Sequence, residues 1–168
     1  MLRHIFLAGV PATGKTWLGS WLAEQRGYVH IDAERNGGSD FDAHGLHEAW
    51  DEVIATGRAD GFVAAADRLG KSVVVNWGFP TCYLYVVSAL QSAGVDAWWL
   101  QAERTLARAA FTARGGIDPR CFEKQMDDIE REWLLISPVF GSKIVDGLRS
   151  DGTQRTPAEL WAEMAAGG

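Results

Sequence analysis

The sequence predicts an α/β fold of three layers, in which a parallel sheet of five strands lies between two layers of helices. Short apolar segments alternate along the chain with longer segments whose apolar residues recur at helical spacing. One short segment, 72–75, contains Val73, Val74 and Val75 in a row, which is typical of strands buried on both faces. Strands that alternate with helices pair in parallel, because each helix returns the chain to the same edge of the sheet.

The apolar pattern places each element in turn. Strands are expected at about residues 3–8, 28–31, 72–75, 95–100 and 143–145. Helices are expected at about residues 15–26, 42–57, 59–69, 81–93, 103–114, 118–136 and 157–164. Gly27 closes the first helix, and Pro157 opens the last one, because proline is favoured in the first helical turn.

The composition is that of one globular domain, residues 1–168, with 47% apolar and 23% charged residues. The net charge of −6 gives the chain no general attraction to nucleic acid or to an anionic membrane. No apolar segment has the length of a membrane span. The chain enters its first strand directly and contains only two cysteines, Cys82 and Cys121. We therefore expect a cytoplasmic protein with two buried thiols.

Eight tryptophans are many for a chain of this length. Trp98 and Trp99 are neighbours in one predicted strand, so their side chains must point to opposite faces of the sheet. The tryptophans on predicted helices are expected to pack in the core, and they are Trp17, Trp21, Trp50, Trp133 and Trp161.

The most specific motif follows the first strand. Residues 9–16 match the pattern G-x-x-x-x-G-K-[ST] and read Gly9, Val10, Pro11, Ala12, Thr13, Gly14, Lys15 and Thr16. Between a strand and a helix, such a loop binds phosphate groups with its backbone N–H groups and the helix N-terminus. We expect the motif and the adjoining Trp17 to bind a nucleoside triphosphate. Lys15 would contact the β- and γ-phosphates, and Thr16 would belong to the Mg²⁺ shell.

Polar residues also follow the second strand, at the edge of the sheet where ligands gather in such folds. Asp32 and Glu34 are one residue apart there. One carboxylate can accept a hydroxyl proton or hold a Mg²⁺-bound water, while the other binds an acceptor molecule. Arg35 can bind a charged acceptor or pair with a neighbouring carboxylate. The alternative interpretation is a solvated loop with ordinary acidic residues.

Arginines cluster after the fourth strand. Arg108 and Arg114 lie mostly off the apolar stripe of the helix at 103–114, Gly115-Gly116 supplies a hinge, and Arg120 is a further candidate. Guanidinium groups stabilise the negative charge that spreads over a migrating phosphoryl group. We predict that at least one of these arginines has this role. A helix with solvated arginines is the alternative.

With these three features, the chain resembles the small P-loop kinases, which include shikimate kinase, gluconate kinase, adenylylsulfate kinase, chloramphenicol phosphotransferase and the zeta-toxin group. The resemblance covers most of the length, although only the motif at 9–16 is highly specific. It implies a strand order of 2-3-1-4-5, ATP as the phosphoryl donor and Mg²⁺ as a cofactor. It also implies that Asp32 lies near the metal and the acceptor hydroxyl, that Glu34 faces the acceptor, and that Arg108 and Arg114 belong to a lid at about 103–125.

The chain departs from this family after the third strand. Many relatives place an aspartate there that orders the metal, whereas this chain has Asn76 followed by Trp77. Asn76 can hold a metal-bound water or hydrogen-bond a substrate without adding negative charge, so Thr16 and Asp32 carry more of the metal binding. Trp77 is either a wall of the acceptor pocket or a core residue. Residues 36–70 occupy the place where the family binds its acceptor.

We therefore predict a Mg·ATP-dependent kinase that transfers the γ-phosphoryl group to a hydroxyl of a small molecule, as a monomer or homodimer. One alternative is a nucleoside or nucleotide kinase, which needs arginines for an acceptor phosphate. Arg58 and Arg68 are the only arginines within residues 36–70, and Arg35 directly precedes this segment. A second alternative is a regulatory or toxin-like nucleotide-binding module with weak turnover, which Asn76 keeps open. Nucleic acid as the acceptor is disfavoured by the acidic charge.

Overall fold

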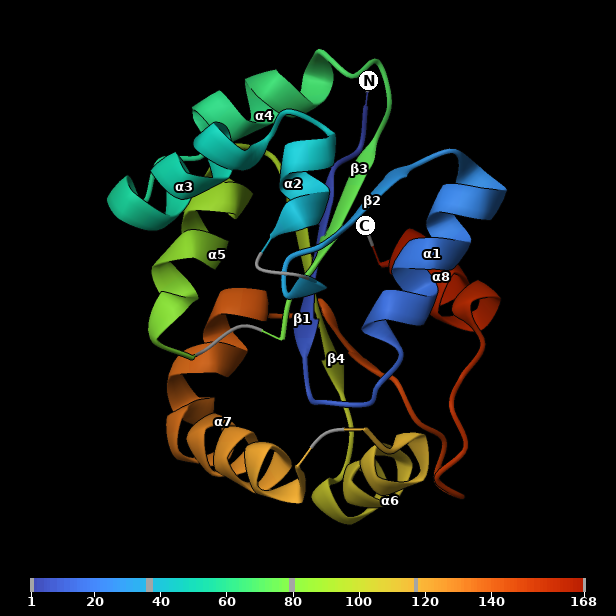
Figure 1. Cartoon of the computed structure of the whole chain (residues 1–168). Helices are drawn as coiled ribbons and strands as arrows, with labels where there is room; N and C mark the ends of the chain where they lie inside the picture. Colours follow the sequence, from blue (N-terminus) through green and yellow to red (C-terminus); the bar gives the residue numbers. More distant parts are fainter. Residues whose placement is uncertain (1, 36–37, 79–80, 117, 168) are drawn as a thin grey trace.

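A five-stranded sheet forms the centre of the molecule (Figure 1). The computed structural model describes residues 2–35, 38–78, 81–116 and 118–167. The strands are β1 (Ile5–Gly9), β2 (Val29–Asp32), β3 (Val73–Asn76), β4 (Asp96–Gln101) and β5 (Ile144–Asp146). They lie in the order β2-β3-β1-β4-β5, and every neighbouring pair is parallel. The predicted fold class and strand order are confirmed.

Helices cover both faces of this sheet (Figure 1). They are α1 (Lys15–Arg26), α2 (Ser39–Ala43), α3 (His47–Thr56), α4 (Asp60–Asp67), the 3₁₀ helix η2 (Thr81–Tyr83), α5 (Leu84–Ser92), α6 (Arg104–Arg114), α7 (Pro119–Phe140) and α8 (Pro157–Ala166). None of the helices in the described ranges is both long and apolar enough to cross a bilayer.

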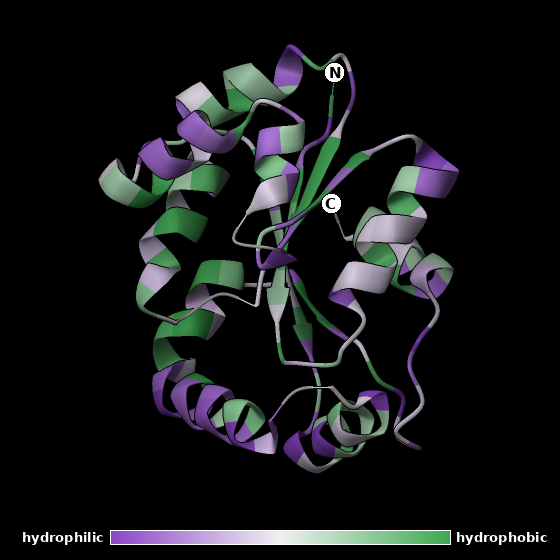
Figure 2. Cartoon of the chain, viewed as in Figure 1, coloured by the Kyte–Doolittle hydropathy of each residue, from purple (hydrophilic) through white to green (hydrophobic). Residues whose placement is uncertain are grey.

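The apolar residues of the strands divide between two cores, one on each face of the sheet. On one face, Ile5, Leu7 and Trp98 pack against apolar residues of α1 and α8. On the other face, Phe6 and Trp99 belong to the larger core, which α3, α4, α5 and α7 cover. Trp98 and Trp99 therefore point to opposite faces, as predicted. Figure 2 shows hydrophobic strands at the centre of the molecule and hydrophilic residues on the outer turns of α7.

The helix expected at 42–57 is two helices, α2 and α3. Gly45, which lies between them, has a φ of 66°, and a residue without Cβ adopts this left-handed conformation at little cost. The turn allows Phe41 of α2 to stack on Trp50 of α3, with ring centroids 4.7 Å apart. Phe41 and Trp50 are buried in the larger core together with Phe62. Residues 36 and 37, at the start of the expected acceptor-binding segment, lie outside the described residues.

Three burial expectations were wrong. Cys82 and Cys121 are exposed, because η2 and the first turn of α7 lie at the surface. Trp17 is 47% exposed, although it belongs to α1. It directly follows the glycine loop, and its side chain points away from the apolar face that Leu18 and Leu22 present to the sheet.

Candidate active site

The glycine loop joins β1 to α1 at the carboxyl edge of the sheet. It begins at Gly9, whose φ is 133°. A Cβ at this position would lie 2.1 Å from the backbone oxygen of Leu100 in β4. The next residue, Val10, donates its N–H to that same oxygen over 2.9 Å. Only glycine lets the chain leave β1 so close to β4, so the motif's first glycine is fixed by packing.

Hydrogen bonds hold the loop in shape. The Thr13 hydroxyl donates to the Val10 carbonyl over 2.7 Å, and Lys15 Nζ donates to the carbonyls of Gly9 (2.9 Å) and Val10 (2.8 Å). Gln154, far along the sequence, donates to the Ala12 carbonyl over 3.0 Å. With these carbonyls engaged, the N–H groups at the start of α1 form a site for an anion, which the helix dipole also favours.

Lys15 is buried, with 9% of its surface exposed. Burial lowers the pKa of its ammonium group to about 8. The positive charge of Arg114 also lowers this pKa, whereas the negative charges of Glu34 and Asp32 raise it. A phosphate group would compensate for the lost solvation of Lys15, so the loop is poised to gain a negatively charged ligand.

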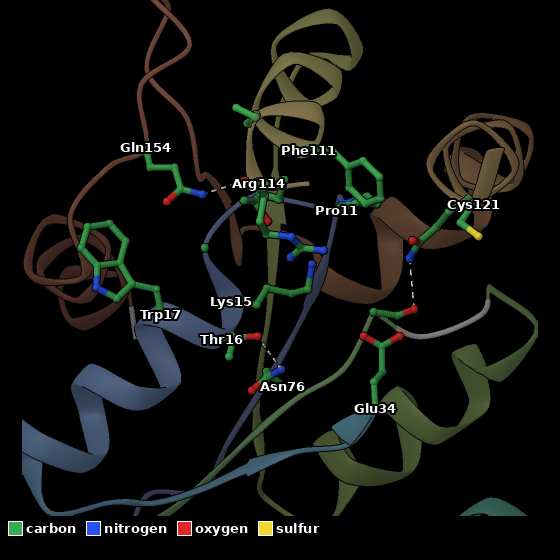
Figure 3. A pocket seen from close by; sticks show the side chains of 17 residues that line it. Pro11, Lys15, Thr16, Trp17, Glu34, Asn76, Phe111, Arg114, Cys121 and Gln154 are labelled. Carbon is green, nitrogen blue, oxygen red and sulfur yellow. Dashed lines mark hydrogen bonds between the residues drawn. The ribbon is translucent and has the colours of Figure 1, made fainter. Parts of the chain in front are cut away.

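A cleft of about 780 Å³ opens over the loop (Figure 3). Figure 3 shows Lys15 and Arg114 between two ends of this cleft. We call the end beside Trp17 and Gln154 the loop end. The other end, which we call the acceptor end, is lined by Glu34, Gly78, Phe111, Cys121 and Gln125. Together they form one connected space from the phosphate loop to a carboxylate.

Thr16, Asp32, Asn76 and His30 form a chain of hydrogen bonds beneath the cleft. The Thr16 hydroxyl is 3.3 Å from Asp32 Oδ2 and 3.3 Å from the Asn76 Nδ2. An ionised carboxylate can only accept, so Thr16 donates its one proton to Asp32 and accepts from the Asn76 NH₂ group. The Asn76 oxygen then faces His30 Nε2, which must carry a proton and donate it. The buried amide of Asn76 therefore presents N–H, not oxygen, toward Thr16.

The sequence reasoning missed His30. Its signal was present, because His30 and Asp32 are two residues apart in β2 and so project from the same face of the strand. Gly19 of α1 makes the room for this ring, since a Cβ there would lie 2.3 Å from His30 Nε2. Gln125 and Cys121 were not predicted as site residues either, and they reach the cleft from α7, which is distant in sequence from the glycine loop.

The predicted site residues do not all meet in the cleft. The residues of the motif from Pro11 to Thr16, together with Trp17, Glu34, Asn76 and Arg114, line it, and Asp32 contacts it through Thr16. Arg35 is exposed and does not line the cleft. The ring of Trp77 packs between Trp50 and Tyr83, at 5.6 and 5.4 Å between centroids.

The two arginines that were predicted to belong to a lid differ in position. Arg114 lies beside Lys15 in the cleft (Figure 3). Arg108 instead donates two hydrogen bonds to Glu123 of α7, over 2.6 and 3.0 Å. Glu123 also accepts from Arg104 over 2.5 Å, so an ion-pair cluster joins α6 to α7. Arg120 pairs with Asp118 at the start of α7.

Comparison with solved structures places this architecture among known folds. A gluconokinase from Sinorhizobium meliloti 1021 aligns with a TM-score of 0.58 and 20% identity, over 98% of this chain and 90% of that chain. A shikimate kinase from Acinetobacter baumannii, in complex with shikimate, aligns with a TM-score of 0.56 and 17% identity, over 98% and 92%. This chain has the fold of the small P-loop kinases.

A shikimate kinase from Bacteroides thetaiotaomicron shares the P-loop kinase fold, with a TM-score of 0.51 and 14% identity over 99% of this chain and 96% of that chain. No protein-family model matches the sequence, and no curated protein matches it either. The similarity to these kinases therefore lies in the fold, because only 14–20% of the aligned residues are identical.

Proposed function

We propose that this protein is a Mg·ATP-dependent kinase that transfers the γ-phosphoryl group to a hydroxyl of a small molecule. The observation that carries the proposal is that one cleft joins the phosphate loop, Arg114 and the carboxylate of Glu34. The fold shared with gluconate and shikimate kinases supports the coarser assignment to a kinase-like enzyme. Residues 103–125 serve as the lid in this proposal, residues 36–70 shape the acceptor side, and the protein acts in the cytoplasm.

Lys15 and the loop N–H groups bind the phosphates of the nucleotide. On binding, the Lys15 ammonium group exchanges the carbonyls of Gly9 and Val10 for phosphate oxygens. Phosphoryl transfer spreads negative charge over the migrating group, and catalysis consists largely of stabilising that charge and aligning the reactants. Arg114 lies beside Lys15 and supplies a second positive charge at this point.

Asp32 accepts or orients the proton of the attacking hydroxyl. Its Oδ1 already accepts the N–H of Glu34 over 3.1 Å and its Oδ2 the Thr16 hydroxyl, so the carboxylate is held in one orientation. A fixed carboxylate at the phosphate loop suits a general base, because proton transfer requires hydrogen-bond distance to the acceptor. Glu34 would bind the acceptor from the other side.

Thr16 and Asp32 suit a magnesium ion. Both offer oxygen atoms, which Mg²⁺ prefers, and they lie 3.3 Å apart at the loop. Within the described part of the chain no group of three or more His, Cys, Asp or Glu residues could hold a metal by itself. Mg²⁺ commonly keeps several waters and is bound through one or two protein groups plus substrate phosphates. The ion would neutralise phosphate charge at this site.

The proposal is tested by measuring ADP and phosphorylated product with purified protein, Mg·ATP and a panel of hydroxylated acceptors. Lys15→Ala should abolish acceptor-dependent turnover, and Lys71→Ala, a change at an exposed lysine near β3, serves as the matched control. Full turnover in Lys15→Ala would contradict the assignment of the loop. ATP binding without transfer to any acceptor would favour the nucleotide-binding module instead.

A further inference from the structure

The acceptor end of the cleft presents hydrogen-bond acceptors. Gln125 Nε2 donates to the carbonyl of Gly78 over 3.0 Å, and a carbonyl can only accept. The NH₂ group of Gln125 is therefore the part that faces Gly78, and no donor among the described residues bonds its Oε1, which can accept from a ligand. The orientation of this amide follows from the chemistry of its partner.

Glu34 adds a negative charge to the same end. A Cβ on Gly78 would lie 3.0 Å from Glu34 Oε1 and 3.1 Å from Oε2, so the glycine leaves the space in which this carboxylate lies. Figure 3 shows Glu34 below Cys121 and apart from Arg114. The structure gives Glu34 no arginine or lysine within salt-bridge distance among the described residues. Its oxygens face the cleft as acceptors.

The positive charges of the cleft lie elsewhere. Among the described residues that line it, the cations are Lys15 and Arg114, and both lie at the phosphate loop. Phosphate groups of the nucleotide would use both. Arg35 is exposed and does not line the cleft, although it is next to Glu34 in sequence. An acidic acceptor would thus place its own negative charge beside the exposed carboxylate of Glu34, where the like charges repel and no cation of the described lining is left to balance them.

We propose that the acceptor is a polyhydroxylated molecule without an acidic group, neutral or amino-bearing, whose hydroxyl or ammonium donors bind Glu34 and Gln125. This inference rests on the proposed kinase function and narrows its substrate class. The proposed acceptor would differ in charge from those of the gluconokinase and the shikimate-bound kinase that share this fold, since gluconate and shikimate both carry a carboxylate. Sites discriminate against a ligand that leaves a charge unpaired.

Matched acceptors test the class. Glucose, glucosamine and gluconate share one carbon skeleton, and inositol, an aminocyclitol and shikimate form a cyclic set. With Mg·ATP, and with product detected by mass spectrometry, we expect kcat/KM for the neutral or amino members to exceed that for the acid by about tenfold or more, the effect of one charged hydrogen bond. An acid used as well as its neutral partner would overturn the substrate class and leave the kinase function standing. No phosphorylated product from any acceptor would overturn both.

A variant pair ties the preference to Glu34. Glu34→Gln keeps the shape and one accepting oxygen but removes the charge. We expect this variant to lower kcat/KM for amino-bearing acceptors by about tenfold and to change kcat/KM for neutral acceptors by less than about threefold. For acidic acceptors kcat/KM should rise, because the repelling charge is gone. The control is Glu24→Gln, which changes an exposed carboxylate of α1 outside the cleft. It should leave kcat/KM unchanged for all three classes of acceptor. An unaltered ratio of amino to neutral acceptors in Glu34→Gln would overturn the proposal.

Discussion

The imidazole of His30 in β2 donates its Nε2 proton to the side-chain oxygen of Asn76 at the end of β3. This bond fixes which way the buried amide faces, and the amide in turn donates to Thr16 of the phosphate loop. Position 76 is therefore occupied by a neutral group whose N–H side faces the loop. The hydrogen bond between His30 and Asn76 thus determines which hydrogen-bonding group faces Thr16 of the loop.

His30→Phe should destabilise the protein by about 1–3 kcal/mol, because the oxygen of Asn76 stays buried without a donor. Unfolding in urea, followed by circular dichroism, measures this change. His30→Phe combined with Asn76→Val should recover part of the loss, since replacing both partners by apolar groups removes the unsatisfied atom. If the double variant loses more free energy of unfolding than the two single variants lose together, the hydrogen bond is not the cause.

The affinity for ATP should fall as the pH rises above about 8. The pKa of Lys15 is lowered to about 8 by burial, so the free protein loses this positive charge as the pH passes that value. Each further pH unit above this value should lower the affinity for ATP about tenfold, if only the charged lysine binds phosphate. Calorimetric titration between pH 7 and pH 9 measures the slope. Lys15→Met should bind weakly at every pH in this range, and a slope that persists in Lys15→Met would point to another group.

Arg114→Ala should lower kcat far more than Arg108→Ala. Arg114 lies in the cleft beside Lys15, whereas Arg108 is held by Glu123, whose pKa its hydrogen bonds help to lower to about 2. Removing a guanidinium that stabilises the transferring group costs about a hundredfold or more in kcat. Steady-state kinetics with the best acceptor provides the comparison. Equal losses in the two variants would show that Arg108 leaves Glu123 during the reaction.

Gly9→Ala should unfold the protein at much lower urea concentration. The φ of 133° and the backbone oxygen of Leu100, 2.1 Å from the added Cβ, together cost at least about 3 kcal/mol. Gly61→Ala is the matched control, because Gly61 lies in α4 and its Cβ would meet only the flexible Glu52 carboxylate at 3.2 Å. Alanine is the better helix former, so this variant should gain up to about 1 kcal/mol. Similar midpoints for both variants would contradict the packing argument.

The parts of the site that were predicted from sequence are local in the chain. The motif at 9–16 specifies a strand, a turn and a helix within a few residues, and Lys15 and Thr16 follow from it. Asp32 and Glu34 were found because the carboxyl ends of parallel strands share one edge. Their distances to other groups depend on the sheet order, which only the resemblance supplied.

The parts that were missed depend on packing between distant segments. Gln125 and Cys121 reach the cleft because the start of α7 lies opposite the end of β3, and no periodicity reports this. The separation of Arg114 from Arg108 depends on which face of α6 meets Glu123 of α7. The expectation of buried cysteines failed because average burial of a residue type ignores where the element lies.

Trp17 offers a natural optical probe of the reaction. All eight tryptophans belong to the described residues, and Trp17, with 47% of its surface exposed, is the most exposed of them. Trp98 and Trp99 have only 1% of their surface exposed. A water-soluble quencher added to the native protein would reach its indole in preference to the others. Because it lines the loop end of the cleft, its emission would reveal occupancy of the site without any label or change in the chain.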